Sequence, residues 1–170
     1  MATKRATTQE PKIGVPATAV VSGAFLSGSM MSLSAFVIPV FLGTNSNDAG
    51  HTTRQWALLY QYGRQYMPVL CIATCGLYGS AILSKHKASR RYAMAIAATM
   101  AMVPFTWLVM APTNETLFGL EEATGSGSMV EPGLVSGLAV RWAWLHVARS
   151  LFPLVGAIVG FTGLLQELAV

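Results

Sequence analysis

Two polar side chains able to do acid–base and anion chemistry, His146 and Arg149, lie in a segment that otherwise has the composition of a membrane-spanning helix. They occur in the stretch 141-RWAWLHVARS-150. A spacing of three residues places them on one helix face, which Trp142 and Pro153 extend at spacings of four. An imidazole exchanges protons near neutral pH, and a guanidinium stabilises an oxyanion. The spacing therefore predicts a proton-transfer and anion-binding pair inside the membrane.

The length of this segment decides how deep Arg149 lies. If Arg149 marked the membrane edge, residues 150–165 would span only about 24 Å at ~1.5 Å per residue, short of the ~30 Å hydrocarbon core. With Arg141 at the edge, residues 142–165 span about 36 Å. A charge near the bilayer centre costs about 2.5–3.5 kcal/mol and normally faces the bundle interior. The alternative is that Arg149 snorkels to the interface and His146 is an ordinary core histidine.

Partners for this pair must come from the same end of the other spans. Asn114 closely follows the third apolar run, although it could instead cap a short helix, as could Thr113, or be glycosylated within 114-NET-116. Arg64, at the mouth of the second span, and Trp107, in the third, are weaker candidates for substrate binding.

The charges and histidines of the spans favour an oxyanion ligand over a metal. No carboxylate occurs at mid-span, so a pocket around Arg149 would be net positive. One histidine without an acidic or thiol cluster does not make a convincing zinc or iron centre. His51 and His86 fall in loops, so the sequence does not predict a bis-histidine haem.

The elements that must position these residues are four apolar helices. Of 170 residues, 53% are hydrophobic and 11% charged, against about 25% charged in soluble domains. Backbone polar groups must pair internally in lipid, so the apolar runs are helices. The sequence predicts an all-α integral membrane four-helix bundle, with a disordered tail over 1–15 and one domain over 16–170. The expected spans are about 17–42, 66–84, 92–111 and 138–165.

Loop charges predict the orientation. Basic residues gather in the N-terminal tail and in 84-SKHKASRR-91, whereas most acidic residues lie in the other two connections. By the positive-inside rule both termini are cytoplasmic. We expect a multi-pass endomembrane protein of the endoplasmic reticulum or derived vesicles, in contact with lipid. The basic residues are too scattered for nucleic-acid binding. Short lumenal helices are expected over 54–68 and from Thr113 or Asn114 through Glu122.

The prolines and cysteines of the spans bear on the shape of the bundle and on redox chemistry. One proline per span, each in the lumenal half or near the midplane, would kink the bundle and open a lumen-facing cavity; these are Pro39, Pro68, Pro104 and Pro153. Cys71 and Cys75 stand one helical turn apart at mid-span, which favours buried structural cysteines over a redox Cys-x-x-Cys motif.

Three segments together resemble the anthrone oxygenases of fungal aromatic polyketide pathways, small four-helix membrane proteins once filed as a domain of unknown function. They are 22-SGAFLSGSMMSLSAFVIPVF-41, 112-PTNETLF-118 and 142-WAWLHVARSLFPL-154. The resemblance covers most of residues 17–165. It implies oxidation of an anthrone, such as emodin anthrone, to the anthraquinone by dioxygen as co-substrate, without flavin, haem or metal. Association with other enzymes of a polyketide pathway is a further expectation.

On this resemblance the site residues take roles. His146 would be the general base that removes a methylene proton, and Arg149 and Asn114 would stabilise the enolate oxygen or peroxide. Trp142 and Trp107 would offer flat surfaces for a tricyclic ring.

Two other functions remain open at this point. One is a non-catalytic four-span scaffold or escort protein, whose binding surface would be the loop 112–133 and for which Arg149 would be only an anchor. The other, less favoured, is a membrane thiol oxidoreductase that uses Cys71 and Cys75.

Overall fold

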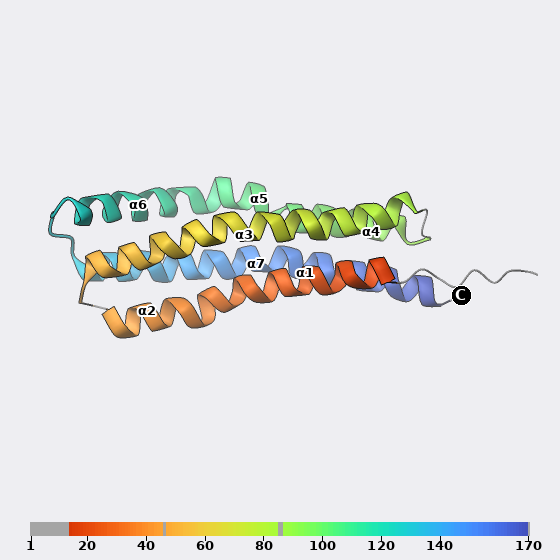
Figure 1. The fold of residues 1–170 in the computed structure, drawn as a ribbon, viewed down its shortest axis with the longest axis horizontal. Coiled ribbons are helices and arrows are strands. Elements are labelled where there is room, and N and C mark those ends of the chain that lie inside the picture. The colour runs from red at the N-terminus through yellow and green to blue at the C-terminus, as the bar shows by residue number, and fades with distance from the viewer. Residues whose placement is uncertain (1–13, 46, 85–86, 170) are drawn as a thin grey trace, which may run out of the picture.

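The chain folds as an all-helical bundle. A computed structural model describes residues 14–45, 47–84 and 87–169, and this part contains no strand. Within it, four helices are long and apolar enough to cross a membrane: Gly14–Thr44, Ala49–Leu83, Ser89–Gly125 and Pro132–Leu168. The predicted four-helix fold is therefore confirmed (Figure 1). The tail expected over 1–15 lies almost wholly outside the described residues, as does His86.

The four spans are built from nine helical elements in the described residues. The first span comprises α1 (Gly14–Ser32), the π-helical segment η1 (Leu33–Val37) and α2 (Ile38–Asn45). The second is α3 (Ala49–Leu83), and the fourth is α7 (Pro132–Leu168). The third comprises α4 (Ser89–Met100), α5 (Met102–Phe105), the π-helical segment η2 (Thr106–Met110) and α6 (Ala111–Gly125).

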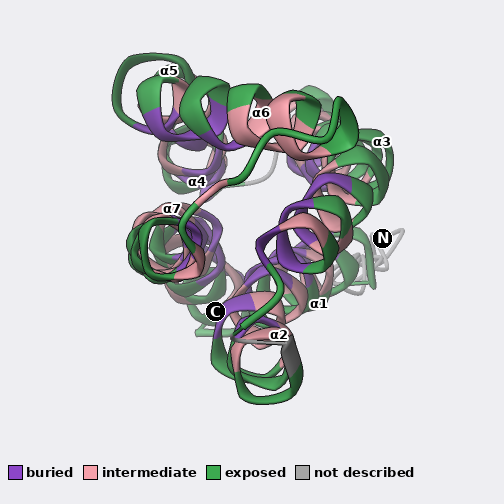
Figure 2. Cartoon of the chain, turned by 90° about the vertical axis from the view of Figure 1, so that its left-hand side faces the viewer, coloured by how far each residue is buried: buried purple, intermediate pink, exposed green. Residues whose placement is uncertain are grey.

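The spans run antiparallel, so α1 begins at the end of the bundle where α7 finishes (Figure 1). We call this the terminal end, and the opposite end, with α2, α6 and the start of α3, the distal end. The spans form a ring: α7 packs against α1 and α4, while α3 packs against α1, α4 and α6 (Figure 2).

The helices at the distal end differ from the sequence prediction. Separate short helices were expected in the two distal connections, but α3 is continuous from Ala49, and the third span runs on through Gly125. The carboxylate of Asp48 caps α3 by accepting the His51 backbone N–H at 2.8 Å. No helix begins at Asn114, so its predicted capping role is wrong. A helix that continues beyond the membrane keeps its backbone N–H and C=O groups paired. This explains why the two distal connections extend the spans and do not form separate short helices.

Both π-helical segments end two residues before a proline. Segment η1 stops at Val37 before Pro39, and η2 stops at Met110 before Pro112. A proline ring clashes with the carbonyl four residues earlier and removes one helix hydrogen bond. Widening the preceding turn is a known way for membrane helices to accommodate this loss. Pro68 and Pro153, in contrast, lie within α3 and α7.

Small residues at helix contacts let the helices approach closely. The Ser27 hydroxyl donates to the Ser150 backbone carbonyl at 2.8 Å, joining α1 to α7. On the other side of α7, a Cβ added at Gly160 would collide with the Tyr78 hydroxyl. In these places no side chain of α7 separates its backbone from the neighbouring helix.

Buried residues form three clusters along the bundle axis. The distal cluster contains Ile38, Trp56, Ala57, Met110, Leu117, Ala139 and Trp142. The middle cluster contains Leu26, Met30, Cys71 and Met102. The terminal cluster contains Ala19, Tyr78, Ala81, Ala88, Tyr92 and Ala95.

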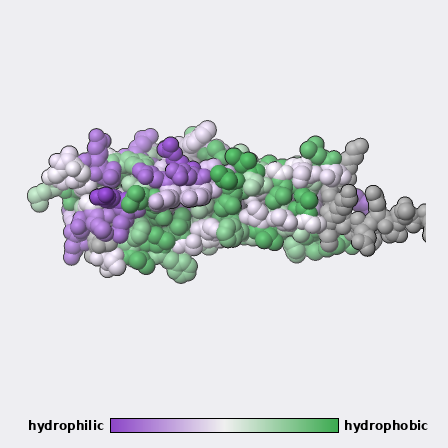
Figure 3. All heavy atoms as spheres, viewed as in Figure 1, coloured by the Kyte–Doolittle hydropathy of each residue, from purple (hydrophilic) through white to green (hydrophobic). Residues whose placement is uncertain are grey.

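The outer surface of the bundle is largely apolar over the terminal half, and hydrophilic side chains gather toward the distal end (Figure 3). Large apolar side chains such as Val21, Phe25 and Ile158 are more than half exposed. An exposed apolar surface of this extent is what lipid contact requires.

Candidate active site

His146 and Arg149 form a hydrogen-bonded pair on α7. Arg149 Nη2 lies 2.8 Å from His146 Nε2, and the His146 side chain is only 2% exposed. A guanidinium has donors but no acceptor, so Nε2 must accept this hydrogen bond. The imidazole is therefore neutral, with its proton on Nδ1. This is the form of histidine that a general base requires.

Arg149 points into the bundle. Its Nη1 donates to the Thr106 hydroxyl of η2 at 3.3 Å, and that hydroxyl donates to the Met102 carbonyl at 2.7 Å. These contacts direct the guanidinium toward the third span and hold it beside His146. A snorkelling side chain would instead extend along its helix toward the interface, so the anchor interpretation does not describe Arg149.

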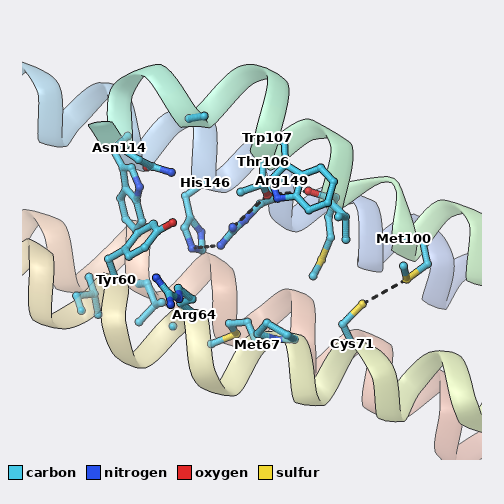
Figure 4. A pocket seen from close by; sticks show the side chains of 18 of the residues that line it. Tyr60, Arg64, Met67, Cys71, Met100, Thr106, Trp107, Asn114, His146 and Arg149 are labelled. Atoms are coloured by element: carbon cyan, nitrogen blue, oxygen red, sulfur yellow. Dashed lines mark hydrogen bonds between the residues drawn. The ribbon is translucent and has the colours of Figure 1, made fainter. Parts of the chain in front are cut away.

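A cavity of about 460 Å³ lies against this pair, between α3, the third span and α7. The structure places all six residues proposed from the sequence on its wall: His146, Arg149, Asn114, Trp142, Trp107 and Arg64. They come from three different spans. Figure 4 labels His146, Arg149, Asn114, Arg64 and Trp107 around one space. The volume falls within the range of roughly 300–1,000 Å³ typical of small-molecule sites.

Four buried polar atoms around the cavity lack a hydrogen-bond partner within the described chain. They are Asn114 Oδ1, Trp142 Nε1, His146 Nδ1 and Arg149 Nε. An unpaired buried polar atom costs about 1–3 kcal/mol. Four of them on residues that line one cavity indicate a polar ligand, with donors for an oxyanion and an acceptor for a hydroxyl group.

The cavity wall carries positive charge. Arg64 and Arg149 both line it, and its lining within the described residues includes no aspartate or glutamate. The described residues also contain no group of three or more His, Cys, Asp or Glu side chains that could hold a metal ion. The arrangement suits an anionic or enolate oxygen.

The predicted residues differ in how they face the cavity. Asn114 is only 6% exposed, so the acceptor amide of the 114-NET-116 sequon is buried in the folded chain. The Trp142 ring is buried and its centroid lies 4.6 Å from that of His146. Trp107 is 74% exposed, so its indole lies at the outer rim rather than inside.

Three groups on the wall were missed from the sequence. Thr106 orients Arg149, and no sequence signal marked it. Tyr60 stands four residues before Arg64 on α3, and that spacing could have placed both on one face. Sulfur-containing side chains line the other part of the cavity: Met67, Cys71, Met100 and Met102. Cys71 is buried, as expected, with its Sγ 4.0 Å from Met100 Sδ, whereas Cys75 is only half-buried.

The cavity does not open toward the distal end as the proline pattern predicted. Four aromatic rings close that end, with the Trp56 centroid 5.5 Å from Tyr60, 5.0 Å from Phe118 and 6.0 Å from Trp142. Pro39 follows a π-helical turn, and Pro68 and Pro153 lie within continuous helices. Pro104 lies in the short helix α5, just after the third span is interrupted at Ala101. The expectation of a lumen-facing cavity is therefore wrong.

Fold and site together define a small four-span membrane protein in which a buried histidine and a half-buried arginine form a pair on the wall of a largely apolar cavity. A family model described as anthrone oxygenase matches residues 56–159, more than half of the chain. The chain belongs to the anthrone oxygenase family, and it is an enzyme of the oxygenase class.

Curated relatives named anthrone oxygenase match over nearly the whole chain. One from Aspergillus novofumigatus is 59% identical over 158 residues, which cover 91% of this chain and 95% of the relative. A second relative, from Cryptosporiopsis, is 48% identical, and the match covers 98% of this chain and 96% of the relative. A third, from Paecilomyces divaricatus, is 44% identical, and the match covers 86% of this chain and 93% of the relative. No solved structure matches the chain.

Proposed function

We propose that this protein oxidises an anthrone to the corresponding anthraquinone with dioxygen, inside the membrane and without a bound cofactor. The observation that carries the proposal is the neutral His146 imidazole held 2.8 Å from Arg149 on the wall of an apolar cavity. The curated relatives named anthrone oxygenase supply the reaction class.

The first step is proton removal. The methylene of an anthrone lies between two aromatic rings and opposite a carbonyl, so its conjugate base is a stabilised enolate. In the ligand-free site, the lone pair of His146 Nε2 is occupied by Arg149. A substrate carbonyl that accepts the Arg149 N–H frees this lone pair. The same contact thus activates His146 and prepares a donor for the negative charge that develops on oxygen.

The oxygen step needs no electrons from the protein. The enolate passes one electron to dioxygen, and the resulting radical pair joins as a carbon–oxygen bond at the former methylene carbon. The peroxide anion takes the proton held by His146. His146 then removes the remaining hydrogen of that carbon as a proton, the O–O bond breaks, and the departing hydroxide is protonated. One anthrone and one O₂ give one quinone and one water.

The remaining residues fit a planar, oxygenated substrate of the emodin anthrone class. Asn114 and Arg64 would bind further substrate oxygens, and the buried Trp142 ring would support the polycycle. The hydrophobic surroundings exclude water, which strengthens the Arg149 contact and protects the enolate from reprotonation by solvent.

Incubating membranes that carry the protein with emodin anthrone tests the proposal. Quinone absorbance should rise faster than in membranes without the protein, with one O₂ consumed per quinone. Under ¹⁸O₂ each quinone should gain a single labelled oxygen. No excess over the spontaneous rate with any of several anthrones would overturn the proposal.

The orientation and surroundings of the protein stay predictions. The loop charges predict that both termini lie on the cytoplasmic side of an endomembrane, and protease protection of tags at each terminus would test this. Association with other polyketide enzymes is a separate expectation that co-purification from the native host would test.

A further inference from the structure

The cavity is closed along the bundle axis in both directions. The four-ring aromatic cluster, which includes the buried Trp56, blocks the distal side. On the terminal side, the middle core cluster packs across the bundle, with Leu26 and Met30 fully buried. A ligand as wide as a tricyclic ring therefore has no axial path through the described bundle.

The second and third spans part at the level of the cavity. Helix α3 packs against α4 on the terminal side and against α6 on the distal side, whereas α5 and η2 pack against α7. The cavity lies where α3 and the α5–η2 segment face each other, and side chains from both line the space (Figure 4). The turn widened before Pro112 lies in this part of the third span.

The residues on the rim of this gap are both cavity-lining and exposed. Ile72 on α3 is 70% exposed, Trp107 on η2 is 74% exposed, and Met100 on α4 is also exposed. The exposed side chain of Leu108, next to Trp107 in the chain, is apolar as well. Since all four lie in helices long and apolar enough to cross a membrane, the rim faces hydrocarbon.

We propose that the cavity opens sideways into the bilayer between α3 and the α5–η2 segment, and that the substrate enters through this side portal from the hydrocarbon. The ligand class is a flat, largely apolar aromatic polycycle. This identification rests on the proposed function, because the portal leads to the His146–Arg149 pair. A tricyclic anthrone dissolves in lipid, so sideways entry also spares it a passage through water.

A portal and a binding site have different kinetic signatures. Narrowing a portal raises the barrier for entry and exit alike, so the association and dissociation rate constants fall by the same factor and Kd is unchanged. A change in the binding site alters Kd itself. Equilibrium and rate measurements on one variant therefore distinguish the two.

The experiment uses the full chain in lipid nanodiscs and the fluorescent quinone 1,8-dihydroxyanthraquinone as probe. Ile72→Trp narrows the portal, and Met100→Trp narrows it from the opposite rim. Val69→Trp is the matched control, because Val69 is 64% exposed on the same helix but does not line the cavity. Both rate constants should fall about fivefold or more in Ile72→Trp and Met100→Trp, a larger change than any change in Kd, and stay as in wild type in Val69→Trp.

Unchanged rates in both rim variants would overturn the portal, and so would equal slowing in Val69→Trp. Failure of the proposed function would appear differently, as probe binding by wild type without anthrone oxidation. A wild-type protein that binds no probe would overturn the proposed ligand of the portal, whereas the oxidation assay with anthrones decides the proposed function.

Discussion

Replacing Arg149 by methionine should separate activity from stability. Methionine keeps the length and apolar stem of the side chain but removes its charge. If Arg149 serves the reaction, the variant loses catalysis while the fold keeps or gains stability. If Arg149 holds the bundle together, both properties fall together.

The magnitudes follow from the contacts of Arg149. The charge inside the bundle costs about 2.5–3.5 kcal/mol on the insertion scale. Against this, the variant loses two hydrogen bonds, to His146 at 2.8 Å and to Thr106 at 3.3 Å, worth about 1.5 kcal/mol each because the donor is charged. The two contributions nearly cancel, so Tm should change by no more than about 2–4 °C for a chain of this size. Loss of one preorganised oxyanion donor lowers kcat about 10²–10³-fold.

The assay pairs two measurements on the same detergent-solubilised preparations. Oxygen uptake with emodin anthrone gives kcat, and the reaction of the buried Cys71 thiol with a fluorogenic maleimide during heating gives Tm. Arg141→Met is the matched control, since Arg141 is exposed on the same helix and does not line the cavity. It should retain wild-type kcat. Full activity in Arg149→Met, or a fall in its Tm of several degrees, would refute the reasoning.

Three further changes probe the site and the packing. His146→Ala should lower kcat about 10²–10⁴-fold by removing the base; a folded variant with wild-type oxidation would rule His146 out. Thr106→Val should lower kcat by about a factor of five, because Arg149 loses a hydrogen bond of about 1 kcal/mol, and Thr106→Ser should restore the rate; if Ser and Val behave alike, the hydroxyl is not what orients Arg149. Gly160→Ala should destabilise the bundle by about 1–3 kcal/mol through overpacking against Tyr78, measured as a lower Tm, and Tyr78→Phe in the same chain should recover part of it. An unchanged Tm in Gly160→Ala would show that the helices separate without cost.

Much of the architecture could be predicted because the bilayer limits the alternatives. A run of about 20 apolar residues in lipid has only the helix available to pair its backbone. Charge counts then set the expected orientation. The spacing of His146 and Arg149 fixed their common face, because helix geometry relates positions three apart without any tertiary information.

Helix boundaries at the distal end were harder to predict. Residues 49–65 and 112–125 are polar enough to resemble loops, and composition does not show that a membrane helix continues into water. The effect of the prolines was also misjudged, since a proline predicts a lost hydrogen bond but not how the chain compensates. The π-helical turns that end at Val37 and Met110 provide that compensation.

The sequence by itself determined four apolar helices and a polar pair on one face of the last, because periodicity and bilayer thickness act on a single segment at a time. Only the tertiary structure decided that Thr106 orients Arg149, that Tyr60 joins the cavity wall, and that the cavity is closed distally and bounded at its side by exposed apolar residues. These features depend on how α3, η2 and α7 lie against one another. That arrangement follows from packing between residues far apart in the chain, which no local pattern encodes.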